Sequence, residues 1–421
     1  MRGIPLCIAK MSTFQKTYPI VTLFFHVLFH PSAYYLHRLL FSRRKPRRSS
    51  GGPISLSLVK SLEERCHIGY NNRGNPMTKS DRFLRACRRE VVDCTPVWLM
   101  RQAGRYMEEY RLMREKHGFL EMCRTPELAA EVTMQPIRRF DLDAAIIFSD
   151  ILLPLESMGV RLSFGEGGGP VIENRVASKQ DVLDLKGIDP ETDLVYVMKA
   201  MEMARDRLEG SVPLIGFCGA PFTLASYLIE GGGSKYYKLA KGMMHTDESA
   251  FHLLMEKLTD MAALYVNAQV RHGAQAIQVF DSWVGILSTT DYRAYVLPHM
   301  LKLFSSIDKS VPSIHFGVGT FHLLPLMEEA GGDVIGVDWR TPIDEARALF
   351  TRRPAVQGNL DPTVLFTSFD YIEGQVKDIL ARVNGSPGHI FNLGHGILPD
   401  TPVENVDFLI SSVHRESKRF L

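Results

Sequence analysis

Short apolar runs alternate with longer amphipathic stretches along most of this chain. Each apolar run is followed by a polar or glycine-rich break, and then by a segment with the helical spacing of apolar residues. This alternation predicts parallel strands covered by helices. The expected strands are Val97–Met100, Ala144–Phe148, Leu214–Phe217, Ala276–Phe280, Ser313–Phe316, Val334–Trp339, Ala355–Gly358 and His389–Leu393. The expected helices include Pro126–Phe140, Leu194–Leu208, Glu248–His272, Tyr292–Ser306, Thr320–Ala330 and Phe369–Val383.

About eight such repeats in roughly 300 residues predict an α/β fold of the (β/α)8 TIM-barrel type in a single domain. A doubly wound nucleotide-binding sheet would instead need a GxGxxG turn directly between a strand and a helix. The glycine cluster Gly165–Pro170 ends in proline and opens no helix, and Gly231–Lys235 lacks the spacing of a phosphate-binding loop. We interpret both clusters as loops or hairpin turns.

The first 76 residues differ in composition from the rest of the chain. They contain 12 Lys and Arg residues but only two acidic residues, and the apolar stretch Tyr18–Leu40 is interrupted by His26, His30, Pro31 and His37. That stretch is a poor membrane span, so no stable membrane insertion is expected. We interpret residues 1–76 as a basic extension outside the folded core, either a mis-assigned start or a targeting leader.

The folded domain is expected to cover residues 77–421, beginning with a helix capped by Ser80 or Asp81 and ending near Arg89. With the extension removed, 37 basic and 45 acidic residues remain. An acidic body argues against a general nucleic-acid-binding surface. The six cysteines form no CxxC pair, which argues against a zinc ribbon and fits a reducing compartment.

A barrel of this type carries its chemistry at the carboxyl ends of its strands. The first expected strand is followed by Arg101 and Arg105, with Gly104 between them to allow a tight turn. Two guanidinium groups so placed form an anion clamp, because arginine binds carboxylates through two parallel hydrogen bonds. The alternative is a pair of surface arginines at the start of a helix.

Other polar residues follow the later strands. The second strand leads to Asp150, the third leads through a short helix to Tyr227, the fourth to Ser282, and the last to His395 between two glycines. Each has a plainer interpretation: Asp150 and Ser282 as helix caps, Tyr227 as half-buried core. His395 is in an unusual position for a core histidine, which favours a functional role.

Five ordered blocks resemble the uroporphyrinogen decarboxylase family. They are Pro96–Tyr106, Phe148–Leu152, Gly216–Thr223, Phe280–Trp283 and Asn392–Gly396. The similarity extends from about Asp81 to the C-terminus and omits only the leader. No single block is specific by itself, whereas the ordered set is.

The resemblance implies a distorted (β/α)8 barrel that forms a homodimer with its clefts facing each other and uses no metal and no organic cofactor. It implies removal of CO2 from the four acetate arms of uroporphyrinogen III, giving coproporphyrinogen III in tetrapyrrole synthesis. Asp150 and Arg101 would then be catalytic. The implied substrate-binding residues are Arg101, Gln102, Ala103, Gly104, Arg105, Arg114, Phe119, Asp150, Tyr227, Ser282 and His395.

This chemistry needs an electron sink, which a protonated pyrrole ring supplies as CO2 departs. A fixed negative charge near the pyrrole N–H groups stabilises the growing cation, and Asp150 is the carboxylate in the set that suits this role. Tyr227, Ser282 and His395 are expected to give neutral hydrogen bonds. The proton donor stays open between Arg101 with a bound water and His395.

Two alternatives to a decarboxylase remain open. A zinc- or corrinoid-dependent methyltransferase on the same barrel usually has His-x-Cys and a later cysteine as zinc ligands. The corresponding stretch here, Ser313–Gly317, has no thiol, and no cysteine follows Cys218. A non-catalytic tetrapyrrole-binding protein would keep the clamp but would not need Asp150. The expected location is the cytoplasm, or a plastid if residues 1–76 are a transit peptide.

Overall fold

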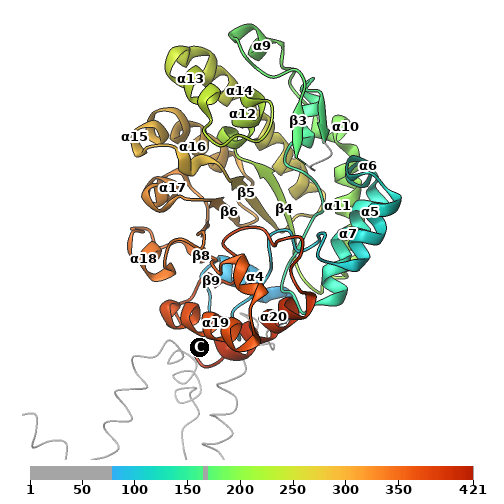
Figure 1. Cartoon of the computed structure of the whole chain (residues 1–421), viewed down its shortest axis with the longest axis vertical. Coiled ribbons are helices and arrows are strands. Elements are labelled where there is room, and N and C mark those ends of the chain that lie inside the picture. Colours follow the sequence, from blue (N-terminus) through green and yellow to red (C-terminus); the bar gives the residue numbers. More distant parts are fainter. Residues whose placement is uncertain (1–77, 165–168, 421) are drawn as a thin grey trace, which may run out of the picture. The chain divides into compact units, whose positions relative to one another are not determined.

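The computed structural model describes residues 78–164 and 169–420. Its centre is a seven-stranded parallel sheet with the order β1-β4-β5-β6-β7-β8-β9, in which each strand pairs with the next one along the chain (Figure 1). The expected extension, residues 1–76, lies outside the described residues. The seven strands are β1 (Ala145–Ile146), β4 (Leu214–Gly219), β5 (Ala276–Asp281), β6 (Ser313–Gly317), β7 (Val334–Gly336), β8 (Ala355–Gln357) and β9 (His389–Ile390).

A short segment around Val97 joins the two edges of this sheet. On one side the Phe391 N–H donates to the Pro96 carbonyl at 2.8 Å, and Val97 forms a parallel bridge with Phe391. On the other side the Asp143 N–H donates to the Val97 carbonyl at 2.8 Å, just before β1. The segment therefore occupies the eighth position, and the sheet closes as a distorted (β/α)8 barrel.

The predicted strand Val97–Met100 is wrong beyond its first residue. The N–H of Leu99 donates to the Gln102 side chain at 3.2 Å, and the N–H of Met100 donates to the Asn392 side chain at 3.1 Å. Side-chain amides thus take the place of a neighbouring strand, and the ladder ends after one bridge.

Helices cover the outside of the sheet (Figure 1). All six predicted helices are confirmed within a few residues, although Tyr292–Ser306 begins with a π-helical turn, η2 (Tyr292–Val296). The α-helices are α4 (Lys79–Cys87), α5 (Glu108–Lys116), α6 (Phe119–Arg124), α7 (Pro126–Arg139), α8 (Leu153–Ser157), α9 (Lys179–Asp184), α10 (Pro190–Asp193), α11 (Val195–Leu208), α12 (Pro221–Glu230), α13 (Lys238–Thr246), α14 (Glu248–Arg271), α15 (Thr289–Asp291), α16 (Leu297–Ser306), α17 (Leu324–Ala330), α18 (Ile343–Ala348), α19 (Phe369–Val383) and α20 (Val403–Ser417).

The first helix starts earlier than the sequence predicts. Helix α4 begins at Lys79 with Thr78 as its N-cap residue, because the Asp81 N–H donates to the Thr78 carbonyl at 3.1 Å. Ser80 and Asp81 therefore lie in the first turn and do not cap the helix. The acidic Asp81 is still favourable there, near the positive end of the helix dipole.

The glycine cluster Gly231–Lys235 forms a loop, as expected, whereas most of Gly165–Pro170 lies outside the described residues. Strands β2 (Leu162–Phe164) and β3 (Pro170–Ile172) pair antiparallel on either side of residues 165–168, which lie outside the described residues. Gly231 ends helix α12 with a φ of 82°, a left-handed conformation that glycine adopts without strain.

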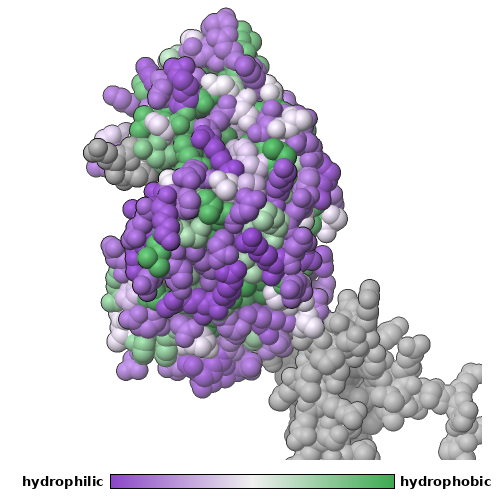
Figure 2. Space-filling view, turned by 90° about the vertical axis from the view of Figure 1, so that its right-hand side faces the viewer, coloured by the Kyte–Doolittle hydropathy of each residue, from purple (hydrophilic) through white to green (hydrophobic). Residues whose placement is uncertain are grey.

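The inside of the barrel is filled with side chains. Trp98, Ile215, Ile314 and Ile390 belong to one apolar cluster whose members alternate with outward-facing residues along their segments. The Trp98 indole donates to Gln357 at 2.9 Å, so its polar atom has a partner. Figure 2 shows one face of the molecule, on which hydrophilic side chains predominate. None of the helices described here is long and apolar enough to cross a membrane.

Candidate active site

Arg101 and Arg105 lie in the loop that follows the Val97 segment, and both side chains are exposed. Within the described residues, neither guanidinium forms a hydrogen bond or a close ion pair. By contrast, Arg124 is paired with Glu156 at 2.5 Å and Arg271 with Glu191 at 2.7 Å. Unpaired guanidinium groups at strand ends are suited to binding carboxylates.

Asp150 follows β1 and is half-buried. Its Oδ1 accepts a hydrogen bond from the Leu152 N–H at 2.8 Å, but Leu152 is itself the N-cap residue of α8, so the interpretation of Asp150 as a helix cap is wrong. Burial raises the pKa of the Asp150 carboxyl, and the Leu152 N–H and the positive charge of Arg101 oppose that rise. The second carboxylate oxygen lies outside the hydrogen bond to Leu152, and the charge of Arg101 is near enough to act on the pKa of the group.

Tyr227 on helix α12 lies near the same carboxylate. Burial, and next the negative charge of Asp150, raise the pKa of Tyr227 to about 12, so the phenol stays protonated at neutral pH. Its ring packs on the Trp283 ring with 3.8 Å between centroids. Trp283 directly follows Ser282, which is half-buried at the end of β5.

His395 sits between two glycines for a steric reason. A Cβ atom on Gly394 would lie 2.2 Å from the Trp339 backbone nitrogen, and one on Gly396 would lie 2.6 Å from the Arg101 Cδ. The Arg101 side chain therefore packs directly over this loop. Burial, together with the charge of Arg101, lowers the pKa of His395, so the imidazole is neutral at pH 7.

A cationic pocket of about 810 Å³ lies beside this group. Its lining includes three arginines, Arg105, Arg111 and Arg114, and two carboxylates, Glu115 and Asp400, of which Asp400 belongs to the loop before α20. The guanidinium of Arg114 lies 5.9 Å from the centre of the Phe119 ring and also donates to the His117 carbonyl at 2.7 Å. The pocket lining does not include Asp150, Tyr227 or His395. The predicted residues thus divide between a charged pocket and the Asp150 group.

Phe119 bridges the two parts through aromatic contacts. Its ring meets the Phe148 ring edge-on at 5.9 Å, and Phe148 comes two residues before Asp150. It also meets Phe164 at 4.9 Å. Phe119 is half-buried, so it packs and still presents part of its surface.

The residues between the two arginines have structural tasks. Gln102 is 1% exposed, and both polar atoms of its side chain bond to backbone groups. Ala103 and Gly104 are half-buried, and a Cβ on Gly104 would lie 3.1 Å from the Arg101 carbonyl. Direct substrate contact by these three residues stays a prediction.

Sequence reasoning overlooked Arg111. Its guanidinium lines the cationic pocket and donates to the carbonyls of Arg105 and Tyr106, both at 2.9 Å. A signal was available, since Arg111 and Arg114 are three apart on helix α5 and thus share a face. Among the described residues, no group of three or more His, Cys, Asp or Glu side chains is placed to hold a metal ion.

The fold and the site define a class: a TIM-type barrel whose strand ends carry free arginines, a half-buried carboxylate and a neutral histidine. The uroporphyrinogen decarboxylase family model matches residues 78–416, and the chain belongs to this family. The chain is 54% identical over 339 residues to the uroporphyrinogen decarboxylase of Carboxydothermus hydrogenoformans. The match covers 80% of this chain and 97% of that protein.

Other relatives agree. The uroporphyrinogen decarboxylase of Trichlorobacter lovleyi is 53% identical over 341 residues, covering 81% of this chain and 100% of that protein. Among solved structures, a methyltransferase from Methanosarcina mazei superposes with a TM-score of 0.67 at 22% identity, covering 80% of this chain and 99% of that one. At that identity the likeness shows a shared fold alone.

Proposed function

We propose that this chain is a carboxy-lyase that converts uroporphyrinogen III to coproporphyrinogen III, without a metal or an organic cofactor. The observation that carries the proposal is the half-buried Asp150 after β1: the charge of Arg101 acts on its pKa, and its own charge helps to raise the pKa of Tyr227. Membership of the family and relatives with that name support it.

In the proposed reaction, a proton first adds to a pyrrole ring of the substrate. The cationic ring then accepts the electron pair of the breaking bond as one acetate leaves as CO2. A second proton adds to the exposed methylene carbon and the ring loses the first, so each acetate is replaced by a methyl group at the expense of one proton. The Asp150 carboxylate stabilises the cationic ring, and its effect grows as the charge develops.

The arginines orient a substrate that carries eight carboxylates. Arg101 and Arg105 have free guanidinium groups, and Arg114 in the adjacent pocket adds a third positive charge. We propose that Arg101 selects the arm that reacts, while Arg105 and Arg114 hold the others. Phe119, half-buried beside Arg114, is proposed to contact the substrate as well.

Neutral hydrogen-bonding groups complete the site. Tyr227 and His395 are both uncharged at neutral pH, because the pKa of the phenol is raised and that of the imidazole is lowered. Together with Ser282 they suit carboxylate arms without adding charge beside Asp150. A neutral His395 is also a poor source of the proton, which favours Arg101 with a bound water as its route.

Replacing Arg105 with Lys is expected to raise KM about tenfold with a smaller change in kcat, because a point charge replaces a two-pronged donor. The measurement is steady-state decarboxylation at several substrate concentrations. Arg139→Lys is a matched control, since Arg139 is paired with Glu109 on the surface. An unchanged KM in Arg105→Lys would count against the clamp.

The rate is expected to fall on the acid side at a pH above the ordinary range for aspartate. Asp150 acts as the ionised form, and its pKa is raised, so activity is lost as pH falls through that raised value. Glu156 contributes to the rise, and Glu156→Gln should therefore move the acid limb of kcat/KM to lower pH. If the acid limb does not move in Glu156→Gln, the loss of activity at low pH does not report the ionisation of Asp150.

We also propose the finer features that the family resemblance implies: a homodimer with facing clefts, and a cytoplasmic location for the domain of residues 77–421. If residues 1–76 are a transit peptide, the location is a plastid. Sedimentation at several concentrations tests the dimer. A tagged full-length chain followed in its host cells tests the location.

The experiment that tests the function is anaerobic incubation of the full chain with uroporphyrinogen III and no added metal. Chromatography of the oxidised products should show a ladder from eight to four carboxylates, and a chain starting at Met77 should give the same ladder. Binding without conversion would favour a tetrapyrrole-binding protein. Stoichiometric zinc in the purified protein would favour the methyltransferase alternative.

A further inference from the structure

We propose that Gln102 is a positioning residue, which fixes the orientation of Arg101 toward Asp150 and does not itself contact the substrate. This inference rests on the proposed function, because it assigns a role within the same site. It differs from the prediction made for Gln102 from the family resemblance, which was substrate binding.

Every polar group of Gln102 is used within the fold. Its N–H donates to the Leu99 carbonyl at 3.0 Å, and its carbonyl accepts from the Tyr106 hydroxyl at 2.7 Å. Its side-chain Oε1 accepts from the Leu99 N–H at 3.2 Å, and its Nε2 donates to the Ala144 carbonyl at 3.2 Å. Each of these groups has a partner, and with 1% of the residue exposed the second Nε2 hydrogen is not accessible to a ligand.

The residue before Gln102 needs such support. Arg101 has a φ of 63°, the left-handed conformation, which is disfavoured for a residue with a Cβ atom. Backbone conformations of this kind persist where the surroundings hold them in place. The turn closed by the two bonds between Leu99 and Gln102 flanks Arg101 on both sides and keeps it in this conformation.

The Nε2 bond links the two parts of the chain that carry the opposite charges. Ala144 leads into β1, and Asp150 follows that strand. Gln102 therefore ties the Arg101 loop to the strand that presents Asp150. The Arg101 side chain also packs on Gly396. The position of the guanidinium is therefore fixed by the Leu99–Gln102 turn at its backbone and by Gly396 along its side chain.

The chain offers a closely matched control in Gln269. It is fully buried, its Oε1 accepts from the Phe217 N–H at 2.8 Å, and its Nε2 donates to the Phe217 carbonyl at 2.9 Å. Like Gln102, it accepts from one backbone N–H and donates to one backbone carbonyl, here both on Phe217 of β4, and it has no contact with Arg101. Gln102→Met and Gln269→Met remove equivalent bonds while keeping the volume of the side chain.

We expect Gln102→Met to lower kcat/KM about 100-fold, through a lower kcat and a higher KM. A small misplacement of a reacting group has an effect of that size. Gln269→Met should stay within about threefold of wild type. In an Arg101→Lys background, Gln102→Met should add little further loss, since both changes act through the same guanidinium. If Gln102 acts independently of Arg101, the losses of the two single variants should multiply in the double variant.

Equal losses in Gln102→Met and Gln269→Met, or multiplicative losses with Arg101→Lys, would overturn the proposal. Should Gln102→Met fail to fold, Gln102→Asn, which is one methylene shorter, serves the same test. Fluorescence titration with uroporphyrin, the oxidised tetrapyrrole with eight carboxylates, decides the question independently of turnover. Weaker binding in Gln102→Met than in Gln269→Met supports the positioning role. If the wild-type protein binds uroporphyrin but releases no CO2 from uroporphyrinogen, the proposed function is refuted while the positioning role is not.

Discussion

Asp150→Asn is expected to lower kcat by about 10³-fold while KM stays near its wild-type value. Loss of one preorganised electrostatic group has an effect of this order when its partner charge develops only in the transition state. The side chains are nearly identical in shape, and the Asn Oδ1 still accepts from the Leu152 N–H. The measurement is single-turnover decarboxylation with saturating enzyme, which isolates the chemical step from product release.

Stability gives an independent control for this variant. The folded-state pKa of Asp150 is raised above its unfolded value, so the folded chain binds the proton more tightly. Stability from this group is therefore fully present at low pH and is lost as pH rises through the raised pKa. At pH 7 the ionised carboxylate destabilises the fold, and Asp150→Asn should unfold at an equal or higher temperature than wild type. A variant that melts lower or keeps its rate would argue against the assigned role.

The candidate site residues were chosen because each follows the carboxyl end of an expected strand, and this rule is the reason that a candidate site could be predicted from the sequence. Asp150, Tyr227 and His395 are far apart in sequence, yet a parallel barrel brings the carboxyl ends of its strands to one face. The positive charge of Arg101 lowers the pKa of each of the three groups, against the effect of burial at Asp150 and Tyr227 and together with it at His395. The periodicity that defines the strands is a local signal, and topology supplies the rest.

The sequence pattern could not predict where side chains replace the backbone hydrogen-bond partners of a strand. The apolar run after Val97 has the pattern of a strand, but Gln102 and Asn392 supply the hydrogen bonds that a neighbouring strand would give. No periodicity distinguishes a glutamine that binds a ligand from one that binds the backbone. The cap at Thr78 was missed for a similar reason, since three candidate capping residues lie within four positions.

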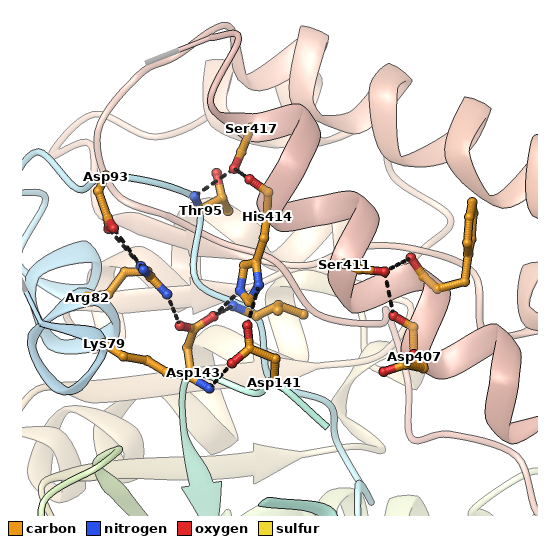
Figure 3. A network of polar contacts seen from close by, with 12 residues as sticks. Lys79, Arg82, Asp93, Thr95, Asp141, Asp143, Asp407, Ser411, His414 and Ser417 are labelled. Atoms are coloured by element: carbon orange, nitrogen blue, oxygen red, sulfur yellow. Dashed lines mark hydrogen bonds and ion pairs between the residues drawn. The ribbon is translucent and has the colours of Figure 1, made fainter. Parts of the chain in front are cut away.

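The closure of the barrel rests on a buried carboxylate that the sequence did not single out. Figure 3 shows Asp143, which is fully buried, between helix α4 and helix α20. Its carboxylate accepts from Arg82 at 2.6 Å, from His414 at 2.7 Å and from the Val97 N–H at 2.8 Å. Because its own N–H donates to the Val97 carbonyl, Asp143 holds the segment that fills the eighth strand position.

Asp143→Ala is therefore expected to lower the free energy of unfolding by about 3–5 kcal/mol, since removing one partner leaves buried charge and a buried N–H uncompensated. Urea unfolding followed by circular dichroism measures the change. Asp141→Asn is the matched control: Asp141 pairs with Lys79 and with His414 in the same network (Figure 3), but its side chain is 69% exposed. That change should alter stability by about 1 kcal/mol or less. Similar losses for both variants would mean that the network acts through surface charge, and that Asp143 does not anchor the closing segment.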